Sequence, residues 1–222
     1  MTPPAEAVVK ERLSLGAVVS AAGGFMDSFS YLLHGGVFAN GQTGNYVLLS
    51  LCLTRRDWLG ALSYLVPIVA FVAGIVVARH VRSSRCGGDR FAAQRYVAAL
   101  EAAAFCALAL VSNELPDLVA NSAVSFLAAV SYQTFKQFGT KSAYSGVFIT
   151  GNLRSLGNSL YDGLVAGSIH ERHRAVCYLA IIGSFGGGVA LGWAMVACMG
   201  HHSCLVIAVL FLVARRLVLR QG

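Results

Sequence analysis

The stretch Phe38-Ala-Asn-Gly-Gln-Thr-Gly-Asn-Tyr46 interrupts a hydrophobic region with polar residues and glycines. A shorter version, Phe148-Ile-Thr-Gly-Asn-Leu153, follows later in the chain, and its Thr-Gly-Asn triplet lies 107 positions after the first. Glycine breaks helices and lets backbones approach closely, so both stretches are expected to interrupt the surrounding helices. Two polar breaks with this spacing predict an internal duplication, in which the broken segments occupy equivalent places.

The rest of the chain has the composition of a membrane protein. Of its 222 residues, 56% are hydrophobic and 12% are charged, whereas soluble domains carry about 25% charged residues. The mean hydropathy of +0.66 predicts a polytopic membrane protein that forms one domain over residues 1–222. The net charge of +7 could indicate nucleic-acid binding, but the basic residues lie between apolar runs. We therefore expect the lipid bilayer as a partner, and no nucleic acid.

Six apolar runs are long enough to be read as membrane spans. The apolar part of the first triplet segment, Tyr46–Leu53, has only about eight residues where a spanning helix needs about 20. We expect a short or re-entrant helix there, capped at Thr43, and an equivalent one after the second triplet, although these segments could still span. The predicted fold class is therefore an all-α integral membrane protein with about six transmembrane helices plus two short or re-entrant helices. The expected spans are Leu13–His34, Leu59–Ala78, Tyr96–Ser112, Leu118–Phe138, Ala175–Gly200 and Ser203–Leu219.

The distribution of arginine predicts the topology. If both triplet segments enter and leave on one side, most basic groups fall inside and the acidic turn 113–117 falls outside, as the positive-inside rule requires. Only Arg55 and Arg56 are then misplaced, and both termini are cytoplasmic. Three spans per repeat also invert the second repeat (about 117–219) relative to the first (about 13–112), an arrangement typical of transporters. The basic groups placed inside are the loop 79–95, Lys136, Lys141, Arg154, the cluster 170–174 and the C-terminal arginines.

The motifs resemble a known family. The residues Gly23-Gly-Phe-Met-Asp27, Tyr31, Phe38-Ala-Asn40 and the two triplets are similar to those of the YoaK-like bacterial inner-membrane proteins, over nearly the whole chain. The resemblance implies a multi-pass protein of the bacterial inner membrane. It supplies neither a substrate nor a catalytic residue, because the family is a domain of unknown function.

Two acidic residues lie inside predicted spans. Asp27 lies about 21 Å along the first span and Glu101 lies five residues into its own. Intramembrane acids are costly and mark functional sites by default. Asp27 could serve as the counter-charge to Arg154 or as a proton carrier, and a purely structural ion pair with Lys136 or Arg154 is the alternative. Glu101 and Lys136 are candidates for coupling or ion pairing, although Glu101 could also extend toward the membrane surface.

The polar residues of the two broken segments form the predicted binding site. The N–H groups at a helix start favour anions, and carbonyls of unwound backbone favour cations. We expect a small polar or anionic solute as the ligand, with Arg154 adding positive charge; the alternative is that the polar groups only satisfy one another across the repeat interface. The predicted substrate-binding residues are Asp27, Asn40, Gln42, Thr43, Gly44, Asn45, Thr150, Gly151, Asn152 and Arg154.

Signatures of enzymes are missing from the sequence. There is no P-loop, no GxSxG and no HExxH, and we expect no catalytic residue, metal or cofactor. The prediction is a secondary transporter or channel. A lipid-modifying membrane enzyme and a non-transporting partner or sensor subunit are the alternatives. Small residues at four-residue intervals on the first span, Gly16, Ser20, Gly24 and Ser28, favour close helix packing, and faces of this kind could also join copies of the chain in a homo-oligomer.

Overall fold

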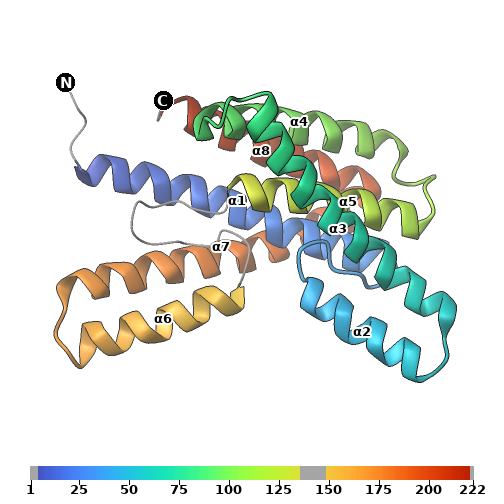
Figure 1. Cartoon of the computed structure of the whole chain (residues 1–222), viewed down its shortest axis with the longest axis horizontal. Coiled ribbons are helices and arrows are strands. Elements are labelled where there is room, and N and C mark those ends of the chain that lie inside the picture. Colours follow the sequence, from blue (N-terminus) through green and yellow to red (C-terminus); the bar gives the residue numbers. More distant parts are fainter. Residues whose placement is uncertain (1–4, 136–148, 221–222) are drawn as a thin grey trace.

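The computed structural model describes residues 5–135 and 149–220, with side chains from residue 13 onward. Within these ranges every regular element is a helix, which confirms the all-α class (Figure 1). Each predicted span coincides with one of these helices, and each triplet with a shorter one. The elements are α1 (Ala5–Leu33), α2 (Gln42–Thr54), α3 (Trp58–Ser84), α4 (Arg90–Val111), α5 (Asp117–Thr134), α6 (Ile149–Leu164), α7 (Ile169–Met199), the 3-10 helix η1 (Gly200–Ser203) and α8 (Cys204–Leu219).

Three local predictions were wrong. Thr43 does not cap α2, because the residue that precedes the helix is Gly41 and no side chain caps it. The predicted loop 79–95 is mostly helical and breaks only between Ser84 and Arg90. The predicted polar loop 170–174 forms the first turns of α7, where the Ser168 hydroxyl accepts a hydrogen bond from the backbone N–H of Glu171. The Glu171 carboxylate also suits the positive end of the helix dipole, so this polar stretch favours a helix start.

Helices from the first part of the chain pack against helices from the second part. The most extensive contacts join α1 with α7, α3 with α5, and α4 with α8 (Figure 1). The short helices lie beside the helix that follows them, α2 against α3 and α6 against α7. If each helix of α1–α4 is exchanged with the helix at the same place in α5–α8, the same set of pairs results: α1 with α7 becomes α5 with α3, and α2 with α3 becomes α6 with α7. The two halves are therefore interleaved and share one core.

Small residues permit the closest of these contacts. A Cβ atom on Gly188 of α7 would lie 2.0 Å from the carbonyl oxygen of Ala21 on α1. A Cβ on Gly74 of α3 would lie 2.5 Å from the carbonyl oxygen of Phe126 on α5. Ser20 donates a hydrogen bond of 2.9 Å to the Ile181 carbonyl. The small-residue face of the first span is therefore used inside the chain, where it lets α1 and α7 approach backbone to backbone.

Three stretches of the described chain are long and apolar enough to cross a membrane. They are α3, α4 and the continuous stretch from Ile169 to Leu219, which contains α7 and α8. The face of α3 away from α5 exposes large apolar side chains, including Leu59, which is 80% exposed, and Val76, which is 62% exposed. Soluble proteins rarely expose apolar surface on this scale. Together these features indicate a membrane protein.

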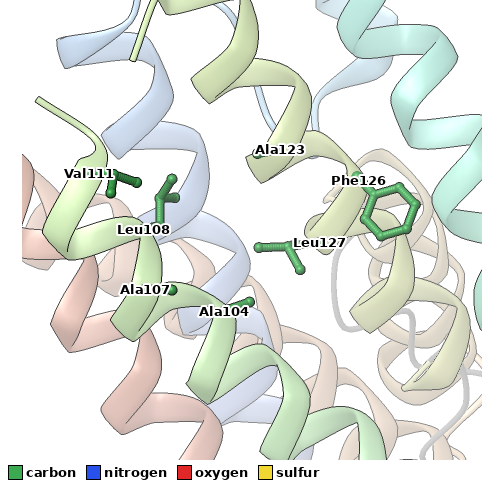
Figure 2. Close-up of a pocket in the computed structure, with 7 residues that line it drawn as sticks. All are labelled: Ala104, Ala107, Leu108, Val111, Ala123, Phe126 and Leu127. Carbon is green, nitrogen blue, oxygen red and sulfur yellow. The ribbon is translucent and has the colours of Figure 1, made fainter. Parts of the chain in front are cut away.

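A groove of about 400 Å³ lies between α4 and α5 (Figure 2). Ala104 and Leu108 line it from α4, and Ala123, Phe126 and Leu127 line it from α5. All the residues that line it are apolar, and none belongs to the predicted binding site. The groove is therefore suited to hydrocarbon and not to a polar solute.

Candidate functional site

The first triplet opens α2, and its asparagine anchors the preceding loop. The Asn45 side chain is fully buried and pairs with both backbone groups of Phe38: its Oδ1 accepts from the Phe38 N–H at 3.0 Å, and its Nδ2 donates to the Phe38 carbonyl at 2.7 Å. The same Nδ2 lies 3.0 Å from Oε1 of Gln42, whose Nε2 donates to the Ala39 carbonyl. Asn45 and Gln42 thus fix the turn that leads into α2.

The glycines of this segment leave room for an aromatic ring. A Cβ on Gly41 or on Gly44 would lie 3.0 Å from the Phe38 side chain. The Phe38 ring stacks on Tyr31 of α1, with ring centroids 5.0 Å apart. Thr43 is exposed. In the first triplet, therefore, the glycine allows close packing and the asparagine holds the loop, while the threonine faces outward.

Asp27 of α1 receives the loop directly in front of α2. Its Oδ1 accepts a hydrogen bond of 2.6 Å from the backbone N–H of Asn40, and the backbone groups of Ala39 and Gly41 also interact with the carboxylate. The Asn40 side chain donates from Nδ2 to the Gly23 carbonyl at 2.9 Å, while its buried Oδ1 has no partner in the described part of the chain. Asp27 is only 8% exposed. A negative charge is therefore already present at the N-terminal end of α2, where a helix favours anions.

The second triplet lies in α6, as the first lies at the start of α2. Thr150 is the second described residue of α6, and Thr43 is the second residue of α2. Asn152 is buried like Asn45, whereas Thr150 and Gly151 are exposed. The N-terminal ends of α2 and α6 both point toward the middle of the molecule, and their C-terminal ends point outward (Figure 1). The two triplets thus share a buried asparagine and an exposed threonine, whereas Gly44 packs against Phe38 and a Cβ on Gly151 would meet no described atom within 4 Å.

The predicted ion pairs do not form between described residues. Arg154 lies exposed on α6, and no ion pair joins it to Asp27. Lys136, the other predicted partner, lies outside the described residues. Glu101 is completely buried in α4, between turns that contribute Val97 and Phe105 to the apolar core. Neither of its carboxyl oxygens has a hydrogen-bond partner within the described ranges.

A polar cluster that the sequence did not predict joins four helix ends. His34, just after α1, lies with Nδ1 3.0 Å from Oδ1 of Asp117 on α5 and with Nε2 3.3 Å from the hydroxyl of Ser112, which follows α4. Ser112 also lies 3.1 Å from Nδ1 of His201 in η1. We call His34, Ser112, Asp117 and His201 the histidine cluster. It places the C-terminal ends of α1, α4 and α7 and the N-terminal end of α5 at one face of the molecule.

The histidine cluster contains the Asp–His–Ser order of serine hydrolases. Two features argue against such chemistry. Ser112 is fully buried, so its hydroxyl does not face an open site. It also caps the C-terminal end of α4, where helix carbonyls collect, whereas an oxyanion needs N–H donors. The described residues also hold no group of three or more His, Cys, Asp or Glu side chains arranged for a metal ion.

Comparison with known proteins assigns the chain to a family. The model of the family described as "Protein of unknown function (DUF1275)" matches residues 15–217. The chain belongs to this family. The match runs from α1 to α8, and so it includes Asp27, both triplets and the histidine cluster. No curated protein and no solved structure matches the chain.

Proposed function

We propose that this chain is a secondary transporter or channel for a small polar or anionic solute. The resemblance of its motifs to the YoaK-like proteins supports only the location in the bacterial inner membrane. The observation that carries the proposal is the placement of the two triplets. The first opens α2 and the second lies in the first described turn of α6, and these ends of the two helices point toward the middle of the molecule (Figure 1). Paired discontinuous helices at a repeat interface are how many transporters bind their substrates.

Helix lengths support a topology of six spans and two re-entrant helices. With 13 residues, α2 is shorter than the about 20 residues that crossing requires, and the described part of α6 has 16 residues. Asn40, just before α2, is hydrogen-bonded to Asp27. Asp27 precedes His34 by seven residues, so the start of α2 lies at a level about 10 Å from the end of α1, measured along the axis of α1. From there α2 returns toward the face at which α3 begins. This path fits a helix that starts within the membrane and leaves on the side from which it entered.

The histidine cluster supports the same topology. If α2 and α6 do not cross, α1, α4 and α7 end on one side of the membrane and α5 begins there. The cluster joins these four ends. The positive-inside rule then places the cluster and the acidic turn outside, with both termini in the cytoplasm. The interleaved helix pairs also fit two inverted repeats, since exchanging the halves preserves every major contact.

An asymmetry between the halves favours an anionic solute. Asp27 already provides negative charge at the start of α2, whereas position 134, which the 107-residue offset places opposite Asp27, is Thr134. The start of α6 also carries the exposed Arg154. This end of α6 has a nearby cation and no carboxylate of the protein that corresponds to Asp27. It is therefore suited to bind an anionic solute. In this proposal Asp27, Asn40 and the two triplets bound the site, and Glu101 is a candidate for coupling.

The alternatives have weaker support. A lipid-modifying enzyme would need an accessible nucleophile, and Ser112 in the histidine cluster is buried. A partner or sensor subunit would not need two opposed broken helices. A homo-oligomer fits the transporter proposal as well, because Gly183 and Gly187 of α7 have open space where a Cβ would lie.

Uptake by reconstituted vesicles tests the proposal. The purified protein would be screened with labelled small anions and neutral polar solutes against protein-free vesicles. We expect uptake of one class, strongly reduced in Asn152→Ala and Arg154→Gln and retained in Asn158→Ala, an exposed amide further along α6. Asp27→Asn keeps an acceptor for the Asn40 N–H, so it should fold and lose transport. If Asp27→Asn and Asn152→Ala change neither stability nor any flux, the assigned site is wrong.

A further inference from the structure

Buried polar side chains connect the histidine cluster with Asp27. On α1, Ser30 lies one turn before His34 and about one turn after Asp27, so the three share a face. On α5, Ser125 lies one turn after Asn121. The Asn121 Nδ2 donates a hydrogen bond of 2.6 Å to the His34 carbonyl, which puts Asn121 level with the end of α1. Because α1 and α5 run in opposite directions (Figure 1), the next turn inward brings Ser125 level with Ser30.

These side chains carry polar atoms that the protein does not satisfy. The Ser30 hydroxyl, the Ser125 hydroxyl and Oδ1 of Asn121 are buried and have no hydrogen-bond partner in the described part of the chain. The same holds for Oδ1 of Asn40, at the inner end of this row beside Asp27. Ser30 and Ser125 are 0% exposed, and Asn121 is 2% exposed. Buried polar groups are nearly always paired. The unpaired atoms of this row are therefore suited to hydrogen-bond a polar solute or water that passes between α1 and α5.

The surroundings of the row are apolar. Val124, next to Ser125 on α5, and Phe29, next to Ser30 on α1, are fully buried members of the core cluster. Polar residues placed in the membrane interior are costly and typically mark the path of a substrate or ion. Hydroxyl and amide groups aligned from one face of the protein to a buried carboxylate have the chemistry of such a path.

We propose that the seam between α1 and α5, lined by Ser30, Asn121 and Ser125, is the route by which the water-borne polar solute passes from the histidine-cluster face to Asp27 and the start of α2. This inference rests on the proposed function and adds the access route to it. The histidine cluster closes the outer end of the seam. It joins α1 and α4 to α5 and η1, and the hydrogen bond from Asn121 to the His34 carbonyl also joins α5 to α1 at this end. The seam can widen only when these contacts separate.

One of the contacts that hold the closure, between His34 and Asp117, is one that water can replace. The Asp117 side chain is 63% exposed, although its partner His34 is only 1% exposed. An exposed hydrogen-bond partner is readily exchanged for water, which gives a low barrier to separating α1 from α5. Removing the Asp117 carboxylate takes away the contact at Nδ1 of His34 and should therefore shift the population toward the open seam.

Thiol accessibility tests the route without knowledge of the solute. Ser125→Cys would be introduced into the full-length protein in membranes, and a small, charged, membrane-impermeant methanethiosulfonate reagent would be added from the periplasmic side. Mass spectrometry at the introduced position separates its labelling from that of the native cysteines. The matched control is Val124→Cys, which lies on the same helix and is equally buried. We expect labelling at 125 and none at 124.

The second part of the experiment weakens the histidine cluster by substitution. Combined with Asp117→Ala, or with Ser112→Ala if the first variant does not fold, the Ser125→Cys thiol should react about five-fold faster, the effect of losing roughly one hydrogen bond. Equal labelling at 124 and 125, or no labelling at 125 in either background, overturns the route. A vesicle preparation that transports solute while position 125 stays unlabelled would overturn the route alone and leave the proposed function intact.

Discussion

The two halves of the protein share several features and differ in the charge beside their triplets. In both halves a helix that contains a Thr-Gly-Asn triplet packs on the helix that follows, and the asparagine is buried. In the first half, the carboxylate of Asp27 holds the backbone in front of α2. In the second half, the corresponding position is Thr134. The comparison teaches that two parts of one chain can share a triplet and a helix pairing while the charge beside the triplet differs.

The largest expected effect comes from removing the carboxylate that distinguishes the halves. Asp27→Ala leaves the buried N–H of Asn40 without its acceptor, and we expect a loss of about 3 kcal/mol in the free energy of unfolding, as for hydrogen bonds to charged groups. Thermal unfolding of the detergent-purified protein measures it. The control is Thr134→Ala, for which we expect less than about 0.5 kcal/mol. Equal losses at both positions would mean that the halves do not differ in this way.

The next effect tests what the halves have in common. Gly188→Ala would push a methyl group into the Ala21 carbonyl, and Gly74→Ala would do the same at the Phe126 carbonyl, so each should destabilise the protein by about 2 kcal/mol through overpacking. Gly186→Ala is the matched control on α7, since its Cβ would meet open space, and it should be neutral or slightly stabilising. A large loss at 188 with none at 74 would contradict the equivalence of the two helix pairs.

The smallest effect separates the residues of one triplet. Asn45→Ala removes the two hydrogen bonds to Phe38, and we expect a loss of about 1.5 kcal/mol, with the loop before α2 becoming more open to proteolysis. Thr43→Ala changes an exposed side chain and should cost less than about 0.5 kcal/mol. If Thr43→Ala were the more damaging change, the assignment of structural roles within the triplet would be reversed.

The sequence predicted the helices well because hydrophobic length and charge placement determine them. The short segments at Tyr46–Leu53 and after Thr150 were recognised because they cannot reach across a bilayer. The small-residue face of α1 was also recognised, since Ser20 and Gly24 recur at helical spacing. The predictions that failed concern local structure. The start of α7 at Ile169 was predicted as a loop, because charged residues in the first turn of a helix resemble those of a polar loop.

The polar contacts were harder to predict. A pairing of Asp27 with Arg154 was one of the roles considered from opposite charge, with a proton carrier and a pair with Lys136 as alternatives. In the structure the carboxylate meets backbone N–H groups, which no side-chain pattern reveals. The histidine cluster was missed because His34, Ser112 and His201 are far apart in sequence. A signal was available: the predicted topology puts the ends of their spans on the same side of the membrane. If the ends of the predicted spans had been grouped by the side of the membrane on which they lie, these residues would have fallen into one group.

The interleaving of the halves has a consequence for how the protein is made. The partner of α1 is α7, so in the proposed topology α1 enters the bilayer long before the surface that covers Gly24 has been synthesised. Until then its small-residue face must lie against lipid or against the insertion machinery. When α5 is synthesised, its partner α3 is already present. By contrast, α1 remains without its partner α7 until the ribosome has passed residue 199. A chain that stops after α4 therefore lacks the partners of both α1 and α3, and it is a natural substrate for membrane quality control.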